Sequence, residues 1–572
     1  MLQRVKEILV FVLGFGLPLH GALTVFGPPE LRWWKELILL GLVVLTFIGV
    51  LNDRKQFFKY QFHLKKIITW WAFYAVLFLI WGLFLVFINP DFKTSLMAYR
   101  YLGLGFVATL LGYALWQTKL YSAKNGYTMG VKVFHNFCTG LLLGTFASAI
   151  FGFWAKFLGG YQILDQWYST TISSWVPGQT IPLYHQVGDF IRLQGASSGP
   201  VEYAHLALMG LWYGLLFRIQ GQPKYNLVRV FVSATLLLGI WQSGSRAALL
   251  GAIILFVFKG GMCIKPYLKL PPFRWSIDKL AALLLVLIVL TGMAKFTFSK
   301  AILGNVEIMN KNIVRISDID HVTRPIEALN KALEKPFLGN LGELGPAARA
   351  KNLAINNNDQ ALIAESVPFD IMAQLGFVGL FIWLAFFGFY YRQASIELRI
   401  LLIAFAPLML LATIFDMTPV SISFFFILGL GLALPRIVSA FSSDHKVVFN
   451  LKKMAFKIYT EKVWGWNEAN QLNYVERELA GGGIYLVLLE GEVIATYCLV
   501  KEIGHTKLFS FYIHPNLQSL GLGTYLLNEI MTARTLRLQV LKVNFSAKAF
   551  YESNGFENSG EDEHHWHLQR LT

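Results

Sequence analysis

The sequence predicts a polytopic α-helical membrane domain followed by a soluble α/β domain. Three observations lead to this fold class: long apolar segments recur through about residues 1–437, basic residues gather in alternate loops between them, and a glycine-rich turn lies near the C-terminus. The chain has 572 residues, of which 55% are hydrophobic and 15% charged, and its mean hydropathy is +0.50. A chain of this composition is too apolar to be wholly soluble and too long for one domain.

About twelve apolar segments approach the roughly 20 residues that one membrane-crossing helix needs. Their approximate bounds are 7–26, 34–51, 67–88, 97–116, 135–157, 201–218, 227–242, 246–260, 280–298, 366–390, 399–415 and 418–435. The first segment has no cleavage site after its apolar run. We therefore expect a retained span there rather than a signal peptide.

Basic residues between these segments set the expected orientation. They concentrate in alternate loops, which the positive-inside rule assigns to the cytoplasm. These residues are Arg54, Lys55, Lys59, Lys65, Lys66, Lys119, Lys124, Lys132, Arg218, Lys224, Arg229, Lys259, Lys265, Lys269, Arg274 and Arg392. With an even number of spans, both termini are expected in the cytoplasm and the long loops 158–199 and 298–364 on the outer side.

The formal charge of +16 arises from these short basic clusters, and no basic stripe with interleaved aromatics indicates nucleic-acid binding. Cys138, Cys263 and Cys498 lie in different regions, so we expect neither a disulfide nor a metal site. The first long outer loop is either a disordered connector or a surface on which sugar rings stack. Its aromatic residues are Tyr161, Trp167, Tyr168, Trp175 and Tyr184.

Three arginines fall on the expected outer side, against the charge trend. Arg192 precedes the sixth span, Arg246 lies in the tight turn between spans seven and eight, and Arg324 lies in the second long loop. The rigid guanidinium fork binds phosphate through two hydrogen bonds and keeps its charge in a partly dry site. The alternative for each is an arginine that merely reaches the headgroup layer from a helix end.

Four motifs in this order resemble the O-antigen ligase and polymerase superfamily over about residues 1–437. They are Arg192-Leu-Gln-Gly195 with Pro200, Ser245-Arg246-Ala247-Ala248, Arg324 followed by Ala332, Pro336 and Gly339, and the G-x-x-G-L signature within Leu375–Leu380. The resemblance implies a GT-C-like, metal-independent glycosyltransferase of the bacterial inner membrane. It would move a glycan from an undecaprenyl-diphosphate carrier to a hydroxyl of lipid A core or a growing glycan on the periplasmic face, in lipopolysaccharide or exopolysaccharide biosynthesis. Arg246 and Arg324 would bind the diphosphate, with Arg192 as a third ligand.

One position departs from that family. The ligases have a His-Asn pair eleven positions before the first glycine of the G-x-x-G-L signature, where this chain has Glu365-Ser366. Glu365 is then either a partly buried general base or a carboxylate that favours the start of the tenth span through the helix dipole. His321 is the alternative replacement for the missing histidine. The departure favours a polymerase or another branch over a ligase.

The soluble part is expected at 454–572, after a polar and basic linker at 438–453. Its predicted elements are a helix at Glu468–Leu479, strands at Ile484–Leu489, Val493–Val500 and Leu508–Ile513, a helix at Thr524–Met531 and a strand at Leu536–Val543. Between the third strand and the second helix, Gly521 and Gly523 form a turn whose free N–H groups suit a diphosphate, helped by the helix dipole.

Two motifs in this part resemble the GNAT acyltransferases over about residues 449–572: Gln518-x-x-Gly521-x-Gly523, and the segment from Asn544 to Phe556. The resemblance implies an acetyl-CoA-dependent N-acetyltransferase. Its diphosphate would be held at Gln518 and by the backbone of Leu520, Gly521, Leu522, Gly523 and Thr524. Asn544 would orient the pantetheine, and Tyr551 would protonate the leaving thiolate unless it is only a core aromatic. No general base is evident; Glu476, His505 and His514 are undistinguished candidates.

Together these patterns predict a membrane glycan transferase, ligase or polymerase, fused to a cytoplasmic acetyltransferase. The alternative is a transporter or flippase of lipid-linked glycans with a non-catalytic acetyl-CoA-binding tail. Ion-coupled carriers need ionisable groups deep inside their spans, and the predicted spans are almost free of them at mid-depth. The sequence leaves open the glycan, its acceptor, the acceptor of the acetyl group and the oligomeric state.

Overall fold

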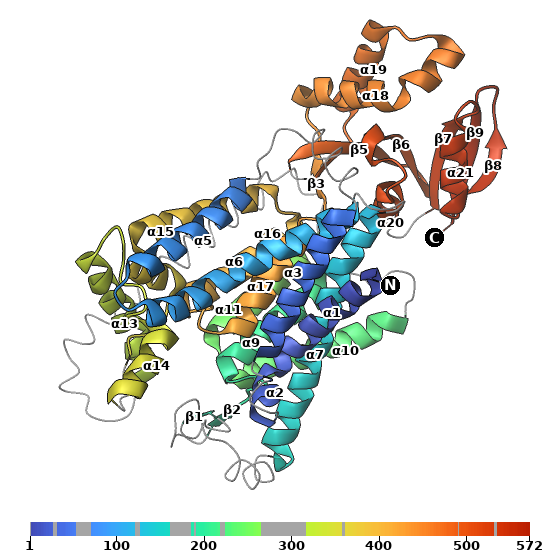
Figure 1. The fold of residues 1–572 in the computed structure, drawn as a ribbon. Coiled ribbons are helices and arrows are strands. Elements are labelled where there is room, and N and C mark those ends of the chain that lie inside the picture. Colours follow the sequence, from blue (N-terminus) through green and yellow to red (C-terminus); the bar gives the residue numbers. More distant parts are fainter. Residues whose placement is uncertain are drawn as a thin grey trace, which may run out of the picture.

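The structure is a computed structural model that describes residues 2–26, 31, 33–52, 70–120, 126–160, 185–187, 190–217, 224–264, 316–356, 361–489, 491–530 and 535–571. A helical region is followed by a C-terminal domain built on one sheet. Figure 1 shows the C-terminal domain at one end of the helical region, while α13, α14, β1 and β2 lie at the opposite end.

Apolar helices make up most of the region before residue 432. Its elements are α1 (Leu2–Gly16), η1 (Leu17–Leu19), α2 (His20–Phe26), α3 (Trp34–Asn52), α5 (Trp70–Ile88), α6 (Phe92–Leu120), α7 (Gly126–Phe157), β1 (His185–Val187), β2 (Phe190–Arg192), α9 (Pro200–Leu216), α10 (Lys224–Ser243), α11 (Arg246–Ile264), α13 (Ile316–Glu334), α14 (Gly345–Asn356), α15 (Val367–Gln393), α16 (Ile396–Leu411) and α17 (Thr418–Gly431). The predicted segments within the described residues are helical over most of their length. The segment 280–298 lies outside them.

Five described helices are long and apolar enough to cross a membrane: Arg4–Thr24, Trp70–Ile88, Phe92–Gln117, Gly130–Phe157 and Val367–Gln393. Leu227–Ser243 and Thr418–Gly431 are shorter apolar helices. The predicted count of twelve spans is therefore not confirmed, although the helical, apolar character of the region is.

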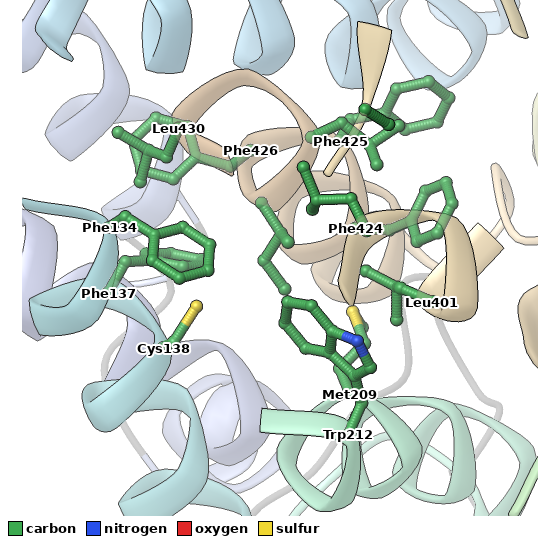
Figure 2. Packing of buried hydrophobic residues seen from close by; sticks show 14 of the residues in the cluster. Phe134, Phe137, Cys138, Met209, Trp212, Leu401, Phe424, Phe425, Phe426 and Leu430 are labelled. Carbon is green, nitrogen blue, oxygen red and sulfur yellow. The ribbon is translucent and has the colours of Figure 1, made fainter. Parts of the chain in front are cut away.

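Large side chains from α7, α9, α16 and α17 form the centre of the helical core. Figure 2 shows Phe134 and Phe137 of α7 facing Phe426 of α17, with Trp212 of α9 below them. The Phe137 and Phe426 rings lie 4.8 Å apart between centroids, and Trp212 Nε1 donates a hydrogen bond of 2.8 Å to the Glu397 carbonyl. Many apolar side chains of the other helices of this region are exposed, among them Phe47, Ile80, Phe87, Phe231 and Phe381. Apolar exposure on this scale marks a surface that a membrane or a partner covers.

Small residues let several helices approach closely. The Thr109 hydroxyl of α6 donates to the Phe425 carbonyl of α17 at 3.0 Å, and a Cβ added at Gly429 would clash with the Thr109 carbonyl oxygen. Gly140 and Gly144 of α7 face the α1 backbone in the same way. Where lipid surrounds helices, the hydrophobic effect does not drive their association. Glycines then stabilise the packing because they allow close van der Waals contact between the backbones.

The C-terminal domain contains a seven-stranded sheet with the order β3-β4-β5-β6-β7-β9-β8. Its elements are β3 (Arg436–Ser439), η3 (Ser442–Asp444), α18 (His445–Trp464), α19 (Glu468–Gly481), β4 (Ile484–Leu489), β5 (Glu492–Lys501), β6 (His505–Ile513), η4 (Pro515–Leu517), α20 (Leu522–Ile530), β7 (Thr535–Leu541), α21 (Phe545–Ser553), β8 (Glu557–Glu561) and β9 (His565–Arg570). Neighbouring strands are antiparallel except β6 and β7, which are parallel.

The predicted strands and helices of this domain are present, with bounds that differ by a few residues. The segment 438–453, expected as a linker, instead contains the end of β3, η3 and the first turns of α18. β3 pairs with β4 from Arg436↔Leu488 to Ser439↔Tyr485. The sheet therefore begins just after α17, with residues 432–435 between them.

Replacing Gly429 with alanine is expected to destabilise the helical region by about 1–3 kcal/mol, because the added methyl group forces α17 away from α6. Gly388→Ala in α15 is the control, since a Cβ at Gly388 meets no atom within 4 Å. Thermal unfolding of the purified chain in detergent should show a lower midpoint for Gly429→Ala only. Equal midpoints for the two variants would contradict this packing.

Candidate active sites

The motifs around Arg324 and the G-x-x-G-L signature pack together at the end of the helical region far from the sheet. A Cβ at Gly339 would lie 2.5 Å from the Gly376 nitrogen, and Phe377 N donates to the Pro336 carbonyl at 2.7 Å. Gly376 has a φ of +71° and interrupts the helical geometry of α15. The positive φ and the close approach explain why both positions hold glycine.

Arg324 and Glu365, two predicted site residues, form an ion pair. Arg324 Nη1 donates to Glu365 Oε1 at 3.2 Å, with both side chains partly exposed. Ser366, not Glu365, occupies the N-cap position of α15, and its side chain makes no capping hydrogen bond. The carboxylate of Glu365 is thus aimed at an arginine, and its backbone has a strained φ of +55°.

Two further carboxyl groups surround this pair. Asp370 is 1% exposed and its Oδ1 accepts from Gln374 Nε2 at 2.9 Å, while its Oδ2 has no hydrogen bond among the described residues. Asp416 accepts from the Thr413 hydroxyl at 2.6 Å and lies within electrostatic range of Asp370 and Glu365. The surroundings of Arg324 are therefore acidic, which suits activation of a hydroxyl better than binding of a diphosphate.

A second cluster is cationic and forms around the turn between α10 and α11. Arg192 Nε donates to the Ser243 carbonyl at 2.6 Å, and Arg246 is the first residue of α11. Lys156, at the end of α7, donates to Gln242 Oε1 at 2.6 Å, and its Nζ lies 4.0 Å from the centre of the Phe190 ring. We call Lys156, Arg192 and Arg246 the basic turn cluster.

Lys156 was not among the predicted site residues, although its position at the outer end of a predicted span breaks the charge rule just as Arg192 does. Neither Lys156 nor Arg192 forms an ion pair with another residue in the ranges that the structure describes. His321 lies in α13, but its side chain is outside the described part. The loop aromatics Tyr161, Trp167, Tyr168, Trp175 and Tyr184 also lie outside the described residues.

The C-terminal sheet opens between its two parallel strands. β6 and β7 pair only at His505↔Thr535, Thr506↔Leu536 and Lys507↔Arg537, although β6 continues to Ile513 and β7 to Leu541. A cavity of about 620 Å³ lies at this divergence, and residues of both strands, α18, α19, α20 and α21 line it. The opening gives an elongated ligand access to the middle of the sheet.

One end of this cavity is the glycine turn. Gly521 has a φ of +88° and α20 begins at the next residue, so free N–H groups of the first helical turn lie at the cavity. Of the residues predicted to hold the diphosphate, Gln518, Gly521, Gly523 and Thr524 line the cavity. The side chains of Leu520 and Leu522 pack on the core, which leaves only their backbone groups for a ligand.

Asn544 and Tyr551 also line the cavity. Asn544 Oδ1 caps α21 by accepting from Ala547 N at 3.1 Å and from the Ser546 hydroxyl at 2.9 Å. Tyr551 packs its ring against Phe550 and Phe556, while its hydroxyl has no hydrogen bond within the described residues. Burial raises the pKa of Tyr551 above its ordinary value, so the hydroxyl keeps its proton at neutral pH.

A carboxylate that the sequence had not distinguished lies in the same wall. Glu478 of α19 accepts from the Ser510 hydroxyl at 2.8 Å through Oε1, and Tyr474 is a second side-chain partner of this carboxylate. Burial raises the pKa of Glu478. Ser510 has a φ of +50° and lies where the register of β5 and β6 shifts, which is a β-bulge. The candidates Glu476, His505 and His514 do not line the cavity.

A family model described as an acetyltransferase (GNAT) domain matches residues 480–558. A 5-NmdU N-acetyltransferase of Pseudomonas phage PaMx11 is 30% identical over 128 residues, which are 21% of this chain and 86% of the relative. The chain therefore belongs, through its C-terminal domain, to the GNAT acetyltransferases. This confirms the resemblance predicted for that domain.

Solved structures with low identity also match this part. The PaiA N-acetyltransferase of Thermoplasma acidophilum in complex with coenzyme A is 15% identical, with 24% of this chain and 99% of that one covered and a TM-score of 0.20. The ribosomal-protein-S18-alanine N-acetyltransferase of Escherichia coli is 20% identical, with 24% and 94% covered and a TM-score of 0.20. Likeness at this level carries no functional information.

GNAT domains bind acetyl-CoA, and the residues present fit this ligand. The glycine turn offers N–H groups to a diphosphate, and the space between β6 and β7 accepts an extended chain. Gly523 has no Cβ to collide with Phe550, which would lie 2.8 Å away. α20 can therefore sit close enough to α21 to form one continuous wall from the turn to Asn544.

Gly521→Val is expected to weaken acetyl-CoA binding by about tenfold or more, because valine does not tolerate a φ of +88° and its branched side chain would displace the N–H groups of the turn. Gly504→Val is the control, since Gly504 has a similar φ of +82° but meets no atom within 4 Å and does not line the cavity. Isothermal calorimetry on the purified chain measures both. Equal losses in both variants would contradict the role of the turn.

Proposed function

We propose that the chain is a bacterial inner-membrane protein with two activities at opposite ends of its helical region. The C-terminal domain transfers an acetyl group from acetyl-CoA to an amine, in the cytoplasm. The helical region transfers an undecaprenyl-diphosphate-linked glycan to an acceptor hydroxyl on the periplasmic face. The observation that carries the first activity is the cavity between β6 and β7, which holds an acid, a carboxylate and a diphosphate turn.

Amine acetylation needs two proton transfers, and this cavity has a group for each. The attacking amine must lose a proton, and the carboxylate of Glu478 can take it because this carboxylate lines the cavity and the Ser510 hydroxyl holds only its Oε1. The departing thiolate must gain one, and the Tyr551 hydroxyl retains its proton because burial raises its pKa. An N-acetyltransferase among the relatives supports an amine as acceptor. An amino group on a cytosolic glycan precursor would connect the two halves of the chain.

Glu478→Gln is expected to lower kcat/KM for acetyl transfer about 100-fold, without changing acetyl-CoA affinity. Glu478 acts in its deprotonated form, and burial raises its pKa, so wild-type activity should rise with pH through that raised pKa. The acidic limb of the pH–rate profile should be absent from Glu478→Gln. Amines drawn from nucleotide-linked amino sugars and 5-NmdU are the acceptors to assay.

Glu476→Gln on the exposed side of α19 is the matched control and should behave as wild type. A wild-type pH profile in Glu478→Gln would remove Glu478 from the proton transfer. It would leave the acetyltransferase activity itself in place.

Two observations support the glycan transferase. The ion pair of Arg324 with Glu365 holds a carboxylate beside Asp370 and Asp416, where it could deprotonate an acceptor hydroxyl. The basic turn cluster places three cations at the N-terminus of α11, where a diphosphate would be neutralised as it leaves. On this proposal Arg324 orients Glu365, while Lys156, Arg192 and Arg246 bind the phosphates.

Arg246→Ala and Lys156→Gln are expected to weaken binding of farnesyl diphosphate to the purified chain by about tenfold each, since each removes one cation from the anion. Arg246→Ala should also abolish the polymeric glycan ladder of the host on a gel. Lys132→Gln is the control for Lys156→Gln, because Lys132 lies at the other end of α7 and pairs with Glu7.

The gel pattern separates the alternatives. If Arg246→Ala leaves a single repeat on lipid A core, the lost activity is that of a polymerase. If it leaves polymer on the carrier, the lost activity is that of a ligase. Accumulation of carrier-linked glycan on the cytoplasmic side would indicate a flippase instead of a transferase. A normal ladder in Arg246→Ala would overturn the role of the basic turn cluster.

A further inference from the structure

A lysine of the domain itself lies in the wall of the acetyltransferase cavity. Lys452 of α18 is 3% exposed and lines the cavity together with Tyr551. Its Nζ lies 4.3 Å from the centre of the Tyr474 ring, and it forms no hydrogen bond or ion pair with another described residue. A buried ammonium without a close carboxylate is costly, so the neutral amine or a neutral derivative is favoured there.

Glu478 is a carboxylate that interacts with this lysine. Glu478 follows Tyr474 by one turn of α19, and it acts electrostatically on Lys452. The Ser510 hydroxyl holds Glu478 Oε1 at 2.8 Å, and Tyr474, whose ring lies against Lys452, is the other side-chain partner of this carboxylate. Burial lowers the pKa of Lys452 and raises that of Glu478, so both groups are shifted towards their neutral forms.

The next residue provides a natural comparison. Lys453 is exposed and pairs with Glu468 outside the cavity. Consecutive helical residues point about 100° apart, so only Lys452 faces the sheet. The two lysines share sequence context and solvent pH but differ in access to the cavity.

We propose that the domain acetylates its own Lys452. The neutral Nζ attacks the thioester carbonyl carbon of acetyl-CoA, a C–N bond forms and the C–S bond breaks with its electron pair remaining on sulfur. Glu478, in its deprotonated form, takes the surplus proton from nitrogen, and Tyr551 gives a proton to sulfur. Solvent restores both groups, so the products are acetyl-lysine and the CoA thiol. This step rests on the acetyltransferase activity of the domain and not on any external acceptor.

Acetylation at this position has a physical consequence for the cavity. It removes the charge of a buried ammonium and adds an acetyl group to the wall formed by α18 and α19. The modified side chain occupies part of the space next to Glu478, where an external amine must also bind. Acetyl-Lys452 therefore competes with the external acceptor.

The test uses the purified full-length chain with deuterated acetyl-CoA, followed by peptide mapping by mass spectrometry. Lys452 is expected to gain the label at least about tenfold faster than Lys453, because attack within one molecule replaces a bimolecular encounter. The rate constant should not depend on protein concentration. Glu478→Gln should slow labelling of Lys452, and Lys452→Arg should remove that label.

A second measurement needs no acetyl-CoA. Competitive labelling with trace acetic anhydride across pH reports the titration of Lys452, which is expected to reach half of its maximal reactivity below the ordinary pKa of a lysine because burial lowers its pKa. Equal labelling of the two lysines by acetyl-CoA, no label on Lys452, or a rate proportional to protein concentration would each overturn the inference. If calorimetry still shows acetyl-CoA binding in that case, the acetyltransferase function stands. If it shows none, the function falls as well.

Discussion

The C-terminal domain depends on how briefly β6 and β7 stay paired. After Lys507 and Arg537 the two strands share no further partners, and the sheet opens where a continuous ladder would otherwise fill it. The β-bulge at Ser510 adds to this divergence by bending β6 at the same place. The cavity lies where β6 and β7 stop pairing, and the glycine turn lies at one end of it. The hydrogen bond of Ser510 with Glu478 lies at the bulge.

In the helical region, the predicted arginines lie in two places with local charges of opposite sign. Arg324 lies among carboxyl groups, whereas the turn between α10 and α11 gathers cations from α7, β2 and α11. The two groups therefore have local charges of opposite sign. The sequence predicted Arg246 and Arg324 together as phosphate ligands with Arg192 as a third, whereas the structure places Arg324 among carboxyl groups and Arg192 at the turn that precedes Arg246.

Much of this organisation could be predicted from sequence because it depends on local signals. Hydrophobic runs indicated the helices, a strand followed by closely spaced glycines indicated the turn before α20, and the resemblance to the GNAT acyltransferases indicated Asn544 and Tyr551. The polar strand β8 carries no apolar alternation, and β3 is only four residues long, so neither gave a usable pattern. Glu478 and Ser510 are 32 residues apart, and Arg324 and Glu365 are 41 apart. Pairs at such separations come together only through the packing of helices and strands, which spacing alone does not encode.

The direct passage from α17 into β3 has a consequence for where the acetyl chemistry takes place. Residues 432–435 span at most about 14 Å when fully extended, and β3 is then held within the sheet by β4. The domain is consequently not joined to the helical region by a long flexible linker. The first strand of the sheet stays within that distance of the last residue of α17, so the domain can turn about this connection but cannot move far from the apolar helices.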